Sequence, residues 1–185
     1  HEKGISIPHL SINISMRQFT HHNFVAQVEA LVQRHLDGEL CRKLIFEVTE
    51  SIVADDISRV IQVMNRLKTS GIRFSMDDFG TGYSSLSQLN KLPIAQLKID
   101  RSFVSQITQN RNDAVIVQTI IGMANNLGVT VIAEGVETEE QRAVLERLGC
   151  LSYQGFLAGK PMPLHQFEEL ATQTIPASAN HRERS

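Results

Sequence analysis

The chain has 185 residues, 42% of them hydrophobic and 21% charged, which is enough for one globular domain with a sizeable core. Its net charge of −2 provides no basic field for a nucleic-acid polymer, although a small nucleotide could bind at a local metal site. The two cysteines, Cys41 and Cys150, form no CxxC pair, and no apolar run is long enough to cross a membrane. A cytoplasmic domain is therefore expected, and a membrane anchor in a longer parent protein is compatible with it.

Six short apolar runs are typical of strands that are buried on both faces. They are residues 10–15, 44–49, 73–78, 96–100, 129–136 and 152–157. Between and after them, helical periodicity predicts helices over residues 24–35, 57–67, 114–127, 138–148 and 163–170. Residues 173–185 are polar and aperiodic, so we expect a domain over residues 1–172 followed by a frayed tail.

Strands that alternate with helices indicate a parallel sheet with right-handed crossovers. An open doubly wound sheet and a barrel both fit this alternation. No GxGxxG segment follows the first strand, which weakens the dinucleotide-binding open sheet. Six βα units are about three quarters of an eight-unit barrel of roughly 250 residues. The prediction is an α/β protein with a TIM-like (β/α) barrel that is incomplete at the N-terminus, with about six of eight units present.

Every predicted strand carries a polar residue at or near its C-terminal end. These residues are Asn13, Glu47, Asp77 with Asp78, Lys98, Glu134 and Gln154. In a barrel such ends converge on one mouth, where active sites are built. Carboxylates that face one mouth repel one another unless cations bind, and oxygen ligands suit Mg²⁺ or Mn²⁺. Adjacent aspartates can serve two ions, the arrangement that clamps the attacking and leaving oxygens of a phosphoryl transfer.

Each of these residues alone also has a structural interpretation. A single strand-end carboxylate is usually a helix cap or a salt-bridge partner, and Gln154 can satisfy backbone groups. Lys98 can form an ion pair with Asp100, which lies two residues along and therefore on the same side of the strand. The presence of a polar residue in all six units favours a functional site.

Residues 77–85 (DDFGTGYSS) combine two glycines with three small hydroxyl side chains. Gly80 and Gly82 can adopt backbone conformations that other residues avoid, so this loop can move over a site or reach a neighbouring subunit. Glu50 can hold the loop by accepting hydrogen bonds. The alternative is an ordinary βα connection in which the hydroxyls and Glu50 cap helices.

Between about residues 10 and 170, the segments SINIS, FEVTES, DDFGTGYSSL, LKIDRSFV, VIAEGVET and YQGFLAGKPMP resemble, in order and spacing, those of the EAL-domain phosphodiesterases. The resemblance implies a TIM-like barrel that hydrolyses cyclic di-GMP to linear pGpG with two Mg²⁺ or Mn²⁺ ions, in bacterial second-messenger signalling. Carried over by position, the metal ligands are Asn13, Glu47, Asp77, which bridges the two ions, Asp78 and Glu134.

The same resemblance assigns the remaining roles. Lys98 supports the attacking water or the phosphate, Glu134 binds metal or orients that water, and Gln154 orients ligands. The loop that couples metal binding to dimerisation contains Phe79, Gly80, Thr81, Gly82, Tyr83, Ser84 and Ser85, with Glu50 as its brace. Asp100, Gly155 and Pro161 belong to the substrate-binding segments. A homodimer through the helix after this loop, and an upstream regulatory or GGDEF-type domain, are also implied.

The strand that carries the Glu-Ala-Leu motif of the family would lie before residue 1, so that motif has no counterpart at its family position in this sequence. Its glutamate is a metal ligand in the family, so we expect the chain alone to have weak activity or none. A longer parent protein, a truncated natural protein and a cleavage product are the three explanations, and we favour the first. Two other classes stay open. One is a cyclic di-GMP-binding effector without catalysis, and the other is a dimerisation module, which leaves the acidic residues unexplained.

Overall fold

The computed structural model describes residues 7–53, 56–82 and 86–174. Within them lies a six-stranded, all-parallel sheet in which the spatial order of the strands equals their chain order. The strands are β1 (Leu10–Asn13), β2 (Leu44–Thr49), β3 (Arg73–Phe79), β4 (Gln96–Ile99), β5 (Thr130–Ala133) and β6 (Ser152–Tyr153). This order belongs to a barrel, because a doubly wound sheet reverses its strand order at a switch point.

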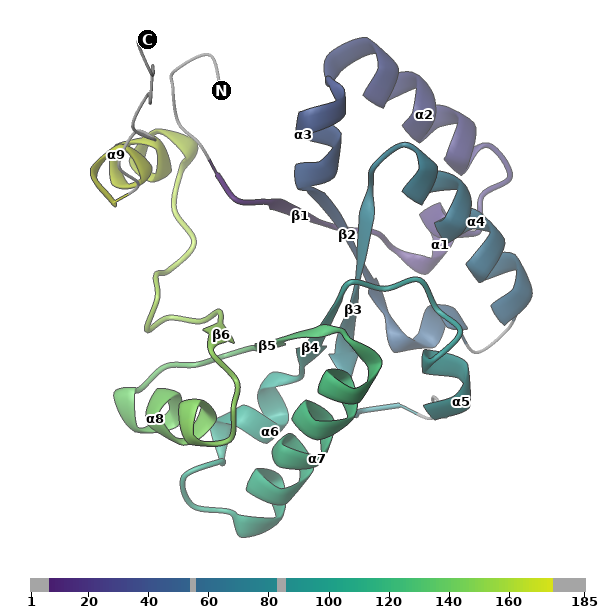
Figure 1. Ribbon diagram of the computed structural model, residues 1–185. Helices are drawn as coiled ribbons and strands as arrows, with labels where there is room; N and C mark the ends of the chain where they lie inside the picture. Colours follow the sequence, from purple (N-terminus) through teal and green to yellow (C-terminus); the bar gives the residue numbers. More distant parts are fainter. Residues whose placement is uncertain (1–6, 54–55, 83–85, 175–185) are drawn as a thin grey trace, which may run out of the picture.

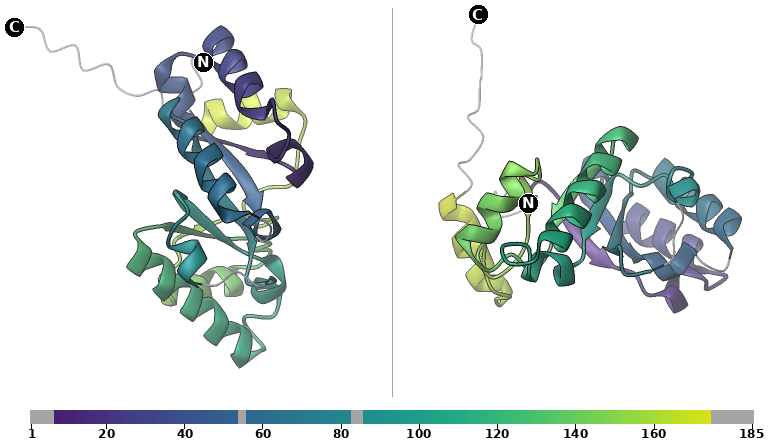
Figure 2. Two further views of the ribbon diagram at one scale, coloured as in Figure 1. Left: turned by 90° about the vertical axis from the view of Figure 1, so that its right-hand side faces the viewer. Right: turned by 90° about the horizontal axis from the view of Figure 1, so that it is seen from below.

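The sheet curls into an open half-barrel with its helices on the outer side, and α9 lies near the start of β1 (Figure 1). Seen from other directions, α2 to α4 cover one half of the sheet, and α6 to α8 cover the other (Figure 2). The helical elements are α1 (Met16–Phe19), α2 (Phe24–His35), α3 (Gly38–Lys43), η1 (Glu50–Val53), α4 (Ile57–Thr69), α5 (Leu86–Leu89), α6 (Arg101–Ser105), α7 (Arg111–Leu127), α8 (Glu139–Arg147) and α9 (Leu164–Thr174).

Local chemistry sets several of these helix ends. Thr138 and Gln141 form the reciprocal capping box that the sequence predicts at the start of α8. Asp100 caps α6 by accepting a hydrogen bond from the backbone N–H of Ser102 at 2.9 Å. Gly128 ends α7 with a φ of 68°, in the left-handed region that favours glycine. The connections between strands are therefore defined by short-range interactions as well as by packing.

The hydrophobic core lies between the outer face of the sheet and the helices. Phe46 of β2 and Phe74 of β3 pack edge to face, with ring centroids 6.1 Å apart. Met64 and Leu67 of α4 are completely buried in this core, and Ile121 of α7 is buried in its other half. Burial of each such side chain contributes about 1.5–3 kcal/mol, so this layer holds the curl of the sheet.

The predicted α/β class and the TIM-like barrel curvature are confirmed, while several element boundaries differ. The short elements α1, α3, η1 and α6 were not predicted, because four to six residues show no measurable periodicity. The short α5 was expected only through the family resemblance, as the helix after the glycine loop. The strand expected over 129–136 ends at Ala133, since Gly135 turns the chain with a φ of 69°. Residues 173 and 174, expected to belong to the frayed tail, are instead the end of α9. The rest of that tail, residues 175–185, lies outside the described residues and remains a prediction. Within the described chain, no helix is long and apolar enough to span a bilayer.

Candidate active site

Strand register brings the polar strand ends together on the inner face of the curl. Asn13 of β1 lies beside Glu47 of β2, and Thr49, two residues further along β2, lies beside Asp77 of β3. Side chains two residues apart on a strand share a face, so Glu47 and Asp77 point into the same space. Lys98 of β4 points there too, as its contacts with these carboxylates show.

Lys98 is the centre of this cluster. Its Nζ lies 2.8 Å from Glu47 Oε2, 3.1 Å from Asp77 Oδ1 and 2.6 Å from Glu134 Oε1, and its side chain is only 3% exposed. Burial acts to lower the pKa of Lys98, but the hydrogen bonds to Glu134 and Glu47 outweigh it and raise that pKa. The ammonium is therefore held in its charged form, and three carboxylates compensate its desolvation.

One ammonium facing three carboxylates leaves an excess of negative charge. Burial, together with the charges of Asp77 and Glu47, raises the pKa of Glu134 above its usual value even though Lys98 opposes this. Gln154 Nε2 donates to Glu134 Oε1 at 3.0 Å and so fixes the orientation of that carboxylate. Such an excess of charge in a buried cluster favours the binding of further cations.

Asp77, Asp78 and Glu134 each present a carboxylate oxygen to one small region, and these oxygens lie within 4.8 Å of one another. Asp78 has a φ of 55°, and its backbone N–H donates to Asp77 Oδ1 at 3.1 Å. A non-glycine residue in the left-handed region is strained, and such strain is concentrated at functional sites. Burial and the charges of Asp77 and Asp100 raise the pKa of Asp78. A donor set made only of carboxylate oxygens fits a hard divalent ion such as Mg²⁺ or Mn²⁺.

Two of the predicted metal ligands lie at the edge of this group. Glu47 is linked to it through Lys98. Asn13 is exposed at the end of β1, beside Glu47 in register. Their roles as ligands remain predictions.

The suggested ion pair between Lys98 and Asp100 is wrong, because Lys98 pairs with three other carboxylates, whereas Asp100 caps α6. Burial acts to raise the pKa of Asp100, but hydrogen bonds from Ser102 outweigh it and hold that pKa below its usual value.

The glycine loop after β3 is attached to a buried carboxylate. Glu50, at the start of η1, is buried, and its Oε2 accepts a hydrogen bond from the N–H of Gly82 at 3.0 Å. A Cβ atom on Gly82 would lie 2.8 Å from that oxygen, so only glycine allows this close approach. Thr81 Oγ1 donates to the carbonyl oxygen of Asp78 at 2.9 Å, and Phe79 is half-buried. The predicted loop residues Tyr83, Ser84 and Ser85 lie outside the described residues.

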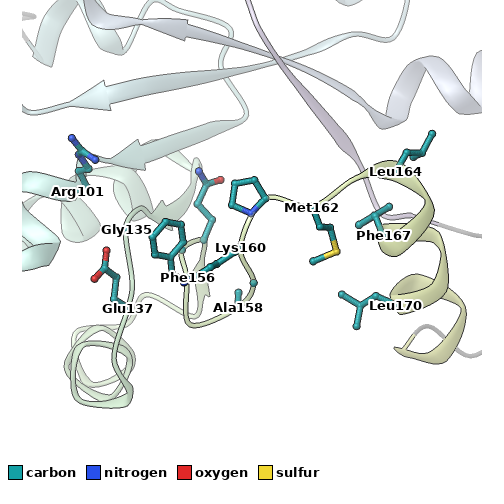
Figure 3. Close-up of a pocket in the computed structure, with 14 residues that line it drawn as sticks. Arg101, Gly135, Glu137, Phe156, Ala158, Lys160, Met162, Leu164, Phe167 and Leu170 are labelled. Carbon is teal, nitrogen blue, oxygen red and sulfur yellow. The ribbon is translucent and has the colours of Figure 1, made fainter.

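A cavity of about 800 Å³ opens beside the cluster (Figure 3). Gln154, Gly155 and Pro161 line it, whereas Asp100 does not. Gly155 has a φ of 155°, and a Cβ there would overlap the backbone of Val136, so the wall of the cavity requires glycine at this position.

The lining residues that the sequence analysis missed include four with charged or aromatic side chains: Arg101, Glu137, Phe156 and Lys160. The Phe156 ring is 55% exposed, and Lys160 Nζ lies 5.3 Å from its centroid. All four lie inside the motif segments that the sequence analysis quoted, so their position in those segments could have identified them as site residues. Met162, Leu164, Phe167 and Leu170 form the apolar side of the cavity, toward α9 (Figure 3).

Comparison with known proteins defines the family. The EAL domain model matches residues 1–161, so the chain belongs to the EAL-domain family. The bifunctional diguanylate cyclase/cyclic di-GMP phosphodiesterase MucR of Pseudomonas aeruginosa is 44% identical over 158 residues. Those residues are 85% of this chain and 23% of MucR, so the chain spans less than a quarter of that relative.

Solved structures show the same architecture. The MucR phosphodiesterase in complex with c-di-GMP matches with a TM-score of 0.81 and 43% identity, over 86% of this chain and 64% of that one. The EAL domain of Mycobacterium smegmatis DcpA matches with a TM-score of 0.83 and 38% identity, over 89% and 73%. Klebsiella pneumoniae BlrP1 in a manganese/cyclic di-GMP complex matches with a TM-score of 0.71 and 32% identity, over 80% and 38%. The curled sheet is thus part of an EAL barrel.

Proposed function

We propose that this chain carries most of the catalytic site of a cyclic di-GMP phosphodiesterase that uses divalent metal ions. The observation that supports this most strongly is the grouping of Asp77, Asp78 and Glu134 around a space that suits a hard cation. The 44% identity to MucR, a protein named for cyclic di-GMP turnover, supports the substrate class. The product is proposed to be linear pGpG.

Asp77, Asp78 and Glu134 would hold the metal, with Glu47 and Asn13 beside them. Two bound Mg²⁺ or Mn²⁺ ions would supply an activated water and neutralise charge on the transferred phosphoryl group. Lys98 adds a fixed positive charge at the same place, where developing negative charge is stabilised without reorganisation. Gln154 keeps the Glu134 carboxylate in one orientation.

The neighbouring cavity suits the rest of a dinucleotide. Phe156 offers an exposed aromatic face for stacking with a base, and Arg101 and Lys160 offer positive charge to phosphate. The MucR and BlrP1 complexes contain cyclic di-GMP, which supports this choice of ligand.

The test is hydrolysis of cyclic di-GMP, with Mg²⁺ and then Mn²⁺, by this chain and by a version extended upstream by about 65 residues, the deficit from a full barrel. We expect the extended protein to form pGpG and a chelating agent to stop it, with little or no turnover by the chain alone. Binding of cyclic di-GMP without cleavage in either metal would instead identify an effector. The intact acidic group argues against that alternative, because binding alone does not need it.

The glycine loop is proposed to couple the metal site to a homodimer, as the family resemblance implies. Gly82→Ala should push the Glu50 carboxylate aside and break its hydrogen bond to the loop. We expect cyclic di-GMP hydrolysis by the extended protein to fall about tenfold or more, in line with the effect of small displacements near a catalytic site, while the melting temperature changes little.

The matched control for this loop is Gly38→Ala, at the start of α3, where an added Cβ meets nothing within 4 Å. This control should retain full activity. Equal rates of hydrolysis for Gly82→Ala and the wild-type protein would show that the hydrogen bond between Glu50 and the loop is dispensable.

A further inference from the structure

A second polar layer lies inside the curl, one step below the acidic cluster. On β3, Arg73, Ser75 and Asp77 alternate along the inner face, and on β4 Gln96 precedes Lys98 by two residues. Ser75 has Glu47 as its partner on β2 and Gln96 as its partner on β4. Ser75 and Gln96 are therefore neighbours that lie one step before Asp77 and Lys98 on their strands, with Glu47 beside Ser75.

Ser75 and Gln96 are deeply buried and Arg73 is half-buried, and each side chain has one buried polar atom without a partner within the described structure. Ser75 is 0% exposed and Gln96 is 7% exposed. Ser75 Oγ, Gln96 Oε1 and Arg73 Nε make no hydrogen bond to any described residue. Buried polar atoms are nearly always hydrogen-bonded, because an unsatisfied one costs free energy. An apolar side chain would avoid this cost, and Ile45, the register partner of Arg73 on β2, is such a buried apolar residue. The retention of three such groups next to the cluster points to a use for them.

We propose that Ser75 and Gln96 are positioning residues that, with Arg73 below them, hold ordered water as a polar floor under the metal site. Neighbouring strands lie about 4.7–4.9 Å apart, and one water molecule can bridge polar side chains at such a spacing. Arg73 Nε–H and the Ser75 hydroxyl donate to the water, and Gln96 Oε1 accepts from it. This inference rests on the proposed metal-dependent function.

The floor acts on the site through two residues of the cluster. Glu47 is the register partner of Ser75, and Lys98 follows Gln96 on the same face. Hydrogen bonds made beneath them limit their rotamers and so preserve the contacts between Lys98 and its three carboxylates.

Ser75→Ala and Gln96→Met test this role, because both remove polar atoms with little change of volume. The affinity for Mn²⁺ is measured by calorimetric titration of the full chain and of its upstream-extended form, together with kcat and KM for cyclic di-GMP. Changes beneath metal ligands typically cost 10–100-fold in affinity or activity, so we expect roughly a tenfold loss of Mn²⁺ affinity and of kcat with KM nearly unchanged. Ser75→Thr, which keeps the hydroxyl, should restore much of the affinity.

The controls are Ser58→Ala and Gln62→Met, the same changes on the exposed face of α4. Wild-type Mn²⁺ affinity and kcat in both floor variants would overturn the proposal. If these variants also melt at a higher temperature than the wild-type protein, the polar atoms of Ser75 and Gln96 have no partner in the native protein. If they melt at a lower temperature, the two side chains contribute to stability only. If the wild-type protein itself binds no Mn²⁺, the metal-dependent function fails and this inference fails with it.

Discussion

Asp77→Asn is expected to reduce cyclic di-GMP hydrolysis by the upstream-extended protein by at least about 10³-fold, or about 4 kcal/mol of transition-state stabilisation. Asp77 takes part in three features of the site. It belongs to the carboxylate group that fits a metal ion, it contacts Lys98, and it accepts the N–H of Asp78. The amide keeps the shape but removes a charge that would help to hold a divalent ion, so Mn²⁺ affinity should fall together with the rate.

Asp37→Asn is the matched control for that prediction. Asp37 is exposed and caps α3, where it accepts hydrogen bonds from the N–H groups of Glu39 and Leu40. Asparagine is also a good cap, so stability and turnover should stay close to those of the wild-type protein. A rate for Asp77→Asn within tenfold of the wild-type rate would show that metal binding does not depend on the carboxylate group.

The strands could be predicted because the sequence concentrates apolar residues in short runs, and their parallel order follows from the helices between them. The short helices could not be predicted, because they depend on local capping interactions rather than on a periodic pattern. Ser15 and Gln18 form a capping box that starts α1, which is only four residues long. The length of the strand expected over residues 129–136 was overestimated for a similar reason. The bend at Gly135 that ends it depends on tight packing against Arg101, which belongs to another βα unit.

The residues of the candidate site that lie at strand ends could be predicted from the sequence, but their mutual contacts and the cavity walls could not. The polar residue at each strand end pointed to one mouth, and the structure brings Glu47, Asp77 and Glu134 around Lys98. The partners of Lys98 depend on the register between strands, which no single strand reveals. The cavity walls were less predictable still, because Phe156 and Lys160 are placed by the chain between β6 and α9.

Lys98→Met should destabilise the metal-free protein by about 3–5 kcal/mol, because it removes one partner of a buried ion-pair cluster and leaves three carboxylates without their cation. For a chain of this length that corresponds to a fall in melting temperature of roughly 6–20 °C. Loss of the fixed positive charge should also reduce cyclic di-GMP hydrolysis by the extended protein about 10²–10³-fold.

Divalent ions should partly rescue the stability of this variant but not its rate. Mn²⁺ can supply the missing positive charge to the cluster, so it should raise the melting temperature of Lys98→Met by more than that of the wild-type protein. Lys43→Met is the control, because Lys43 makes only a surface pair with Glu39 at 3.8 Å, and such pairs contribute less than about 1 kcal/mol. If Mn²⁺ stabilises Lys98→Met no more than the wild-type protein, the lysine and the metal ions do not neutralise the same carboxylates, and the charge argument for this site is wrong.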